Sequence, residues 1–218
     1  APRYSREELE QMFDFSELKS LMAKIRKDEV GVIIPTLHYG CFELLALAYA
    51  KLDCGKISIL AREFGIPALD AWWTTRREMY GNSVFSRKGA YAEIEKRLNR
   101  GRDVSLLFDQ NVKRSHAVFA NLFGIPAATT KTVALASLRT SAPVMLLTSA
   151  EVSPKKFKIF VSHVKMPKEG KREEKVLEFN ERLHRHVEEI IRAHPEQWFW
   201  IHRRYKTRPH GEPEDFYN

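Results

Sequence analysis

The residues best suited to chemistry in this chain are His38 and Glu43, an H-x4-E pair in the segment Pro35-Thr-Leu-His-Tyr-Gly-Cys-Phe-Glu43. The buried-strand pattern of residues 31–35 ends just before it, and an apolar helical pattern follows at residues 42–49. A carboxylate that fixes the tautomer of an imidazole allows that imidazole to act as a general base. The pair therefore indicates proton abstraction from a hydroxyl group.

The spacing of this pair restricts where each residue lies. On one helix a separation of five residues turns about 140° past a full circle, which points the two side chains apart. We therefore expect His38 in the loop before the helix and Glu43 in the first turn, reaching back to the imidazole. An alternative stays open, in which His38 only caps the helix and Glu43 only complements the helix dipole.

Strand and helix patterns alternate along the chain, which predicts one α/β domain over residues 1–218. Ser5 and Glu8 form the pattern of a capping box ahead of a helix that reaches about residue 27. Strands are predicted at 31–36, 56–61, 103–108, 143–150 and 156–161, and further helices at 41–52, 67–80, 90–99, 130–139 and 171–193. The expected fold is an α/β sandwich with a mostly parallel central sheet flanked by helices, in which the last two strands form an antiparallel pair.

Polar clusters follow two of these strands. Asp109-Gln-Asn111 comes directly after strand 103–108, where open α/β sheets bind ligands, although Asp and Asn also favour turns. A basic group of Arg62, Arg76, Arg77 and Arg87 suits phosphate or carboxylate, although surface arginines are commonly just solvated. Residues 123–131 are expected to form an exposed apolar turn leading into a helix capped by threonine.

Composition limits the class of partner. The net charge of +8 favours an acidic partner, such as a nucleic acid, an anionic membrane, a phosphorylated ligand or an acidic carrier protein. Cys41 and Cys54 have neither metal-site spacing nor a disulfide pattern, which fits a reducing compartment. The longest apolar run, residues 44–50, is far short of the roughly 20 residues that span a bilayer. The polar opening carries no signal peptide pattern, and we expect an N-terminal segment to precede it.

The order of these motifs resembles the late acyltransferases of lipid A biosynthesis, the lauroyl and myristoyl transferases. The resemblance covers about residues 30–209. It rests on the H-x4-E pair, on Asp109-Gln-Asn111, on Val118-Phe-x3-Phe-Gly-x-Pro-Ala-Ala-Thr-Thr130, and above all on Glu196-Gln-Trp-Phe-Trp-Ile-His-Arg-Arg204.

The resemblance implies a fold and a reaction. The fold would be like that of the glycerol-phosphate acyltransferases, with Glu in place of the Asp of their H-x4-D motif. The enzyme would move a fatty acyl chain from acyl carrier protein to a hydroxyl of a phosphorylated glycolipid, at the cytoplasmic face of the bacterial inner membrane, without a metal or cofactor. Family members usually begin with a membrane-anchoring helix, which these residues do not show, so we expect either that such a segment precedes them or that the protein docks through basic and apolar surface.

The resemblance also implies roles for particular residues. His38 would be the general base and Glu43 its orienting partner. The substrate-binding positions would be Arg77, Asp109, Arg87 and Arg62. Cys41 and Phe42 replace the common Asn and Trp, which leaves another acceptor open, such as a mannosylated phosphoinositide.

Two other mechanisms compete with this interpretation. Cys41, three residues from His38, could form a covalent acyl-enzyme, although most cysteines at the start of an apolar helix only pack. The tail 202–208, basic and close to aromatic residues, could bind nucleic acid. With the acyltransferase motifs present, we expect neither. The sequence contains no G-x-S-x-G motif, which argues against a serine lipase or thioesterase.

Overall fold

A parallel sheet forms the centre of the computed structural model, which describes residues 4–26, 29–213 and 216–217. Four strands are hydrogen-bonded in the order β1-β4-β2-β3, all parallel. They are β1 (Ile33–Thr36), β2 (Ile57–Ala61), β3 (Ser83–Ser86) and β4 (Asp103–Leu107). The sheet confirms the predicted α/β class. The strand β3 was not predicted, because four residues with a single buried one give too short a pattern.

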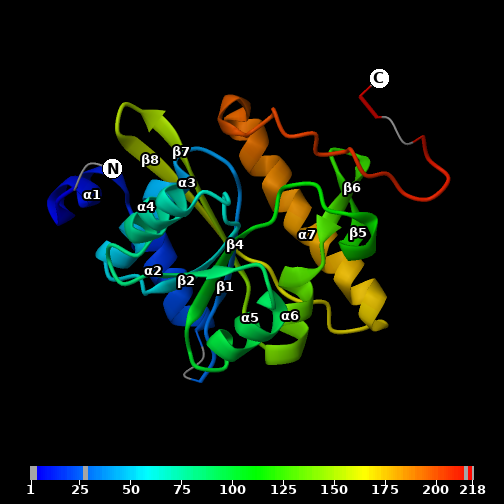
Figure 1. The fold of residues 1–218 in the computed structure, drawn as a ribbon, viewed down its shortest axis with the longest axis horizontal. Coiled ribbons are helices and arrows are strands. Elements are labelled where there is room, and N and C mark those ends of the chain that lie inside the picture. The colour runs from blue at the N-terminus through cyan, green and yellow to red at the C-terminus, as the bar shows by residue number, and fades with distance from the viewer. Residues whose placement is uncertain (1–3, 27–28, 214–215, 218) are drawn as a thin grey trace.

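Helices cover both faces of this sheet, as Figure 1 shows. They are α1 (Arg6–Met12), α2 (Ser16–Ile25), α3 (Phe42–Lys51), α4 (Pro67–Arg77), α5 (Ala90–Leu98), α6 (Thr132–Thr140) and α7 (Arg172–Ala193). Successive residues at the start of β1 point into different cores: Ile33 packs with α5, α6 and α7, whereas Ile34, and Val32 just before the strand, pack with α1, α2 and α3. A strand buried on both faces explains the continuous apolar run that predicted it.

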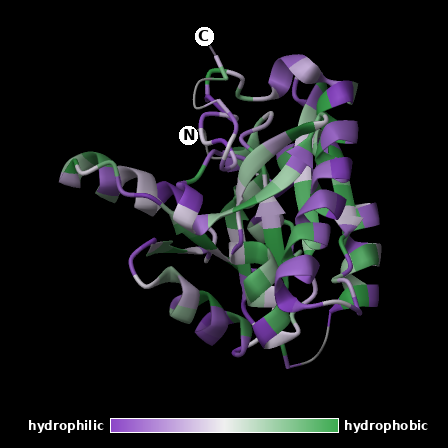
Figure 2. Cartoon of the chain, turned by 90° about the vertical axis from the view of Figure 1, so that its right-hand side faces the viewer, coloured by the Kyte–Doolittle hydropathy of each residue, from purple (hydrophilic) through white to green (hydrophobic). Residues whose placement is uncertain are grey.

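Two antiparallel hairpins complete the fold. One joins β7 (Met145–Ser153) to β8 (Lys156–His163), which confirms the predicted antiparallel pair, and it adjoins β1 through a parallel bridge between Ile33 and Val144. The other joins β5 (Ala117–Leu122) to β6 (Ile125–Thr130). In Figure 2 the central strands are largely green, and green and purple alternate along the helical ribbons, as expected for helices with one buried side.

The β5–β6 hairpin corrects one prediction. Residues 123–131 are mostly its turn and second strand, rather than a free turn leading to a helix. Phe123 and Gly124 both have positive φ, of 53° and 77°, as a two-residue hairpin turn requires. The helix α6 does follow, but its N-cap is Lys131 and not the predicted threonine, and no side chain makes a capping hydrogen bond. The Thr130 hydroxyl, one residue earlier, accepts a hydrogen bond from the Thr132 amide at 3.2 Å.

The first predicted helix is also divided in two. The capping box at Ser5 is confirmed and α1 starts after it, but the chain is extended at Phe13 and a second helix starts at Ser16. Asp14 accepts a hydrogen bond from the Ser16 amide at 2.9 Å, and the break allows Phe13 and Phe15 to be buried. The predicted end near residue 27 lies outside the described residues. Within the described part of the chain, no helix is both long and apolar enough to cross a membrane.

Candidate active site

The candidate site lies at the carboxyl edge of the parallel sheet. β1 and β4 are neighbours, and Thr36 pairs with Leu107 in their register. The residues two positions beyond, His38 and Asp109, therefore leave the sheet side by side. His38 lies in the loop before α3, as predicted, and Glu43 lies in the first turn of that helix.

The loop after β1 is held in shape by its neighbours. Gly40 has a φ of 53° and approaches the Ser149 carbonyl so closely that a Cβ would lie 2.2 Å from its oxygen. Only glycine combines this conformation with this approach. On the other side, the Gly40 amide donates to the Gln197 carbonyl and the Phe199 amide donates to the His38 carbonyl, both at 3.0 Å. The segment of the Glu-Gln-Trp-Phe-Trp motif thus lies directly against His38.

Asp109 is the carboxylate that holds the imidazole. Its Oδ1 lies 2.8 Å from His38 Nδ1, and its Oδ2 accepts from the His38 amide at 2.9 Å and from Trp198 Nε1 at 3.0 Å. Asp109 is 6% exposed. Burial alone would raise the pKa of its carboxyl, but the hydrogen bonds from His38 and Trp198 and the charge of His38 hold it below its usual range. The ionised carboxylate fixes the proton on Nδ1 and leaves Nε2 as the basic nitrogen.

The prediction that Glu43 orients His38 is therefore wrong. Glu43 instead makes a bidentate ion pair with Arg77, at 2.5 Å and 3.1 Å. The physical reason is the packing of α3 against α4, which places the last turn of α4 opposite the first turn of α3. The alternative in which His38 caps the helix does not hold either, because the N-cap is Cys41 and no side chain makes a capping hydrogen bond there.

A cavity of about 200 Å³ opens in front of His38. Three of the predicted arginines line it together with His38 and Glu43: Arg62, Arg77 and Arg87. Its apolar lining comes from Phe42, Ala46, Ile59, Leu60, Leu106 and Leu107. The cavity therefore joins a basic nitrogen, a group of cations and an apolar wall.

Gln110 is a candidate functional residue for which the sequence predicted no role of its own. Its Nε2 lies 3.4 Å from His38 Nε2, and its side chain lines the cavity. Because Nε2 is the nitrogen without a proton, the Gln110 amide is the donor in this contact. The only signal in the sequence was its place between Asp109 and Asn111.

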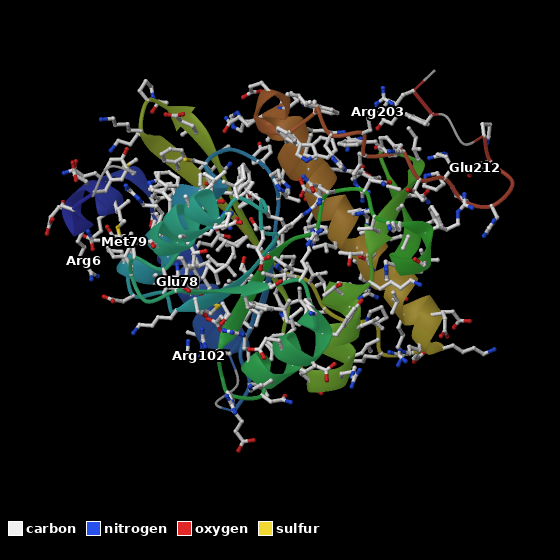
Figure 3. All side chains as sticks on the ribbon, in the orientation of Figure 1. Arg6, Glu78, Met79, Arg102, Arg203 and Glu212 are labelled. Atoms are coloured by element: carbon white, nitrogen blue, oxygen red, sulfur yellow. The ribbon has the colours of Figure 1, made fainter. Side chains whose placement is uncertain are left out.

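The tail after Trp198 is hydrogen-bonded to the loop that follows β4. Asn111 makes three hydrogen bonds to the tail. Its backbone amide donates to His202 Nε2 at 2.7 Å, and its side chain donates to the Thr207 hydroxyl and accepts from the Thr207 amide, both at 3.0 Å. Arg204 is buried and donates to the Ala128 carbonyl and to the Thr129 hydroxyl. Burial lowers the pKa of Arg204 to about 10, and the attraction of Asp109 opposes that effect. The tail crosses β5 and β6 in Figure 1, and Arg203 and Glu212 mark its course in Figure 3.

Cys41 does not have the surroundings of a nucleophile. Burial raises the pKa of its thiol, whereas a reactive cysteine needs a lowered one. The two ring nitrogens of His38 face Asp109 and Gln110 instead. Over the described residues, no group of three or more His, Cys, Asp or Glu side chains is placed to hold a metal ion.

The fold and the site together define an α/β protein with a histidine–carboxylate pair and an arginine-lined cavity at the carboxyl edge of its sheet. Comparison with known proteins places this chain in a family. Residues 1–207 match the model of the bacterial lipid A biosynthesis acyltransferases, and the chain belongs to that family.

Individual relatives are more distant. The chain is 29% identical over 202 residues to the lipid A biosynthesis palmitoleoyltransferase of Escherichia coli K12 and to the lipid A biosynthesis acyltransferase of Shigella flexneri. It is 27% identical over 194 residues to the lipid A biosynthesis lauroyltransferase of Escherichia coli K12. The alignments cover 92%, 92% and 88% of this chain but only 63%, 63% and 61% of the relatives.

Proposed function

We propose that this chain transfers a fatty acyl group from acyl carrier protein to a hydroxyl of a phosphorylated glycolipid, a lipid A precursor, with His38 as the general base. The observation that carries the proposal is the hydrogen bond between His38 Nδ1 and the buried Asp109 carboxylate, which leaves Nε2 directed at an arginine-lined cavity. Membership of the family supplies the reaction class.

The reaction requires one base and no cofactor. The acceptor hydroxyl gives its proton to His38 Nε2 as its oxygen attacks the carbonyl carbon of the thioester. The tetrahedral intermediate collapses, the carbon–sulfur bond breaks, and the proton on Nε2 passes to the leaving thiolate. Asp109 stabilises the imidazolium that forms between these two steps and keeps Nδ1 protonated throughout.

Gln110 acts next to this transfer. Its amide occupies the place beside Nε2 that an acceptor hydroxyl needs, so the hydroxyl displaces it on binding. The displaced amide then lies beside the reacting carbonyl and can donate to the oxyanion of the intermediate.

The arginines account for the choice of a phosphorylated acceptor. Arg77 is held by Glu43 and lies 5.4 Å from the centroid of the Trp73 ring, so its guanidinium is fixed before substrate binds. Arg62 and Arg87 are exposed at the rim of the same cavity. Guanidinium groups bind phosphate through paired hydrogen bonds, so three of them around one opening suit an acceptor with phosphate near the reacting hydroxyl.

The net charge is compatible with the remaining partners that the family resemblance implies. The acyl donor is an acidic carrier protein and the acceptor is held in an anionic membrane, and a chain of charge +8 is attracted to both. We therefore propose that it works at the cytoplasmic face of the bacterial inner membrane.

The test is acyl transfer in detergent micelles from acyl carrier proteins of several chain lengths to a panel of phosphoglycolipids. We expect transfer to a lipid A precursor that is lost in His38→Ala. His186→Ala, which alters a partly exposed histidine on α7, is the matched control and should retain full activity. Transfer only to a mannosylated phosphoinositide would show that this lipid, and not a lipid A precursor, is the acceptor. Activity of His38→Ala equal to that of the wild type would refute the mechanism.

A further inference from the structure

The helix α4 carries several apolar side chains outward. None of its residues is buried. Ile66, Leu69 and Trp72 recur every three residues, which places them within an arc of about 120° on one side of the helix. All three are exposed, as is Phe64 just before the helix. A helix in water normally turns such a stripe toward a core, so this stripe is available to something outside the described chain.

A second exposed apolar segment lies beside His38. Phe199, Trp200 and Ile201 are all exposed, and Ile201 is 85% exposed. The backbone there is fixed rather than loose, because the Phe199 amide bonds to the His38 carbonyl and Trp200 Nε1 donates to the Pro195 carbonyl at 2.6 Å. The Phe199 ring lies 6.1 Å from the His38 ring, centroid to centroid. This segment therefore borders the candidate site.

Both segments lie at the carboxyl edge of the parallel sheet. The stripe on α4 follows the end of β2, and residues 199–201 pack on the loop that follows the end of β1. Phe64 and Trp73 line a cavity of about 150 Å³ that shares Ala61, Arg62 and Arg77 with the cavity in front of His38. Phe64 thus borders the cavity next to the site, and Phe199 lies beside His38.

The charges around these segments favour a lipid bilayer as the occupant. Arg62, Arg87 and Lys88 are exposed at this edge, together with the acids Glu63 and, before residues 199–201, Glu196. A further acid, Asp70 on α4, accepts hydrogen bonds from the Phe64 and Gly65 amides. Arg76 lies 5.0 Å from the centroid of the Trp72 ring, which places a cation beside an exposed indole. Tryptophan, phenylalanine and isoleucine with arginines beside them are typical of side chains at the boundary between lipid headgroups and acyl chains.

We propose that residues 64–72 and 199–201 form the surface through which this chain sits on an anionic lipid bilayer. The apolar side chains enter the headgroup boundary, and the opening in front of His38 faces the headgroups. The proposal deepens the proposed function, because it lets a lipid acceptor reach His38 without leaving the membrane. Binding itself does not depend on catalysis and is measured separately from it.

The structure offers a matched pair of variants for the test. Leu69 on α4 and Leu177 on α7 are helical leucines, each 37% exposed, but only Leu69 belongs to the proposed surface. The whole chain is mixed with vesicles of phosphatidylglycerol and phosphatidylethanolamine, or of phosphatidylcholine alone, and the bound fraction is measured by sedimentation. We expect binding to the anionic vesicles, weakened about tenfold or more by Leu69→Glu and by Ile201→Glu and unchanged by Leu177→Glu.

Three outcomes would overturn the proposal. One is that the chain binds neither kind of vesicle. Another is that Leu69→Glu and Leu177→Glu weaken binding equally, which would indicate charge alone. A third is that Leu69→Glu dissociates a dimer in solution without changing vesicle binding, which would assign the surface to a second copy of the chain. A chain that binds as expected but transfers no acyl group would refute the proposed function and leave this inference standing.

Discussion

Replacement of Asp109 by asparagine isolates the interaction on which the mechanism depends. Two of the three donors around this carboxylate, the His38 amide and Trp198 Nε1, point at the same oxygen, Oδ2. Both require an acceptor, so the side-chain oxygen of the introduced asparagine must take the Oδ2 position. Its NH₂ group then faces His38 Nδ1 and forces the ring proton onto Nε2. The substitution therefore keeps the shape of the site and protonates the nitrogen that should act as the base.

The loss can be estimated from this change of tautomer. General base catalysis contributes about 10²- to 10⁴-fold, and an aspartate-to-asparagine change that reverses the tautomer of a catalytic histidine costs about 10⁴-fold in serine proteases. We expect Asp109→Asn to lower kcat by about 10³- to 10⁴-fold with little change in KM. Trp198→Phe removes one donor from Oδ2 but leaves the carboxylate charge, so its kcat should fall far less.

The assay is steady-state transfer of the acyl group in mixed micelles, with folding of each variant checked by thermal unfolding. The reasoning would be refuted if Asp109→Asn kept a tenth or more of the wild-type kcat. If Glu43→Gln abolished turnover at the same time, Glu43 would regain the role that the sequence assigned to it.

Three further perturbations test other parts of the site. Glu43→Gln should raise KM for the acceptor about tenfold with kcat nearly unchanged, because it releases Arg77; a fall confined to kcat would contradict this role. Gln110→Ala should lower kcat about 10²-fold at unchanged KM, and full activity would exclude it as an oxyanion donor beside His38. Burial lowers the pKa of His184 to about 3. As the pH falls below about 6.5, this histidine therefore binds a proton in the unfolded chain but not in the folded chain. The free energy of unfolding should fall with falling pH, by about 2 kcal/mol at pH 5 from this residue alone. Denaturant unfolding of His184→Gln should lack that part of the decline, and an identical pH profile would contradict it.

The sequence predicted the residues of the site better than their pairing. It placed His38 before a helix, Glu43 in its first turn and Asp109 after a strand, all of which the structure bears out. Which carboxylate reaches His38 depends on the strand order, in which β4 lies between β1 and β2. No local pattern encodes that order, so the sequence alone favours the carboxylate that is nearer along the chain, Glu43.

The missed elements have local explanations. The β5–β6 hairpin turns at Phe-Gly instead of the usual Asn-Gly or Asp-Gly, and its second strand contains Pro126, which normally argues against a strand. The motif from Glu196 to Arg204 was recognised by resemblance, but its place beside His38 comes from a bridge between Tyr39 and Trp198, far apart in sequence. Long-range pairings of this kind cannot be deduced from periodicity.

The central claim is that His38 acts as the base in acyl transfer, and a comparison of wild type with His38→Ala tests it most directly. The measurement is transfer of a labelled acyl group from acyl carrier protein to a lipid A precursor. The account predicts transfer by the wild type and a loss of at least about 10³-fold in His38→Ala. Transfer by His38→Ala at the wild-type rate would contradict it.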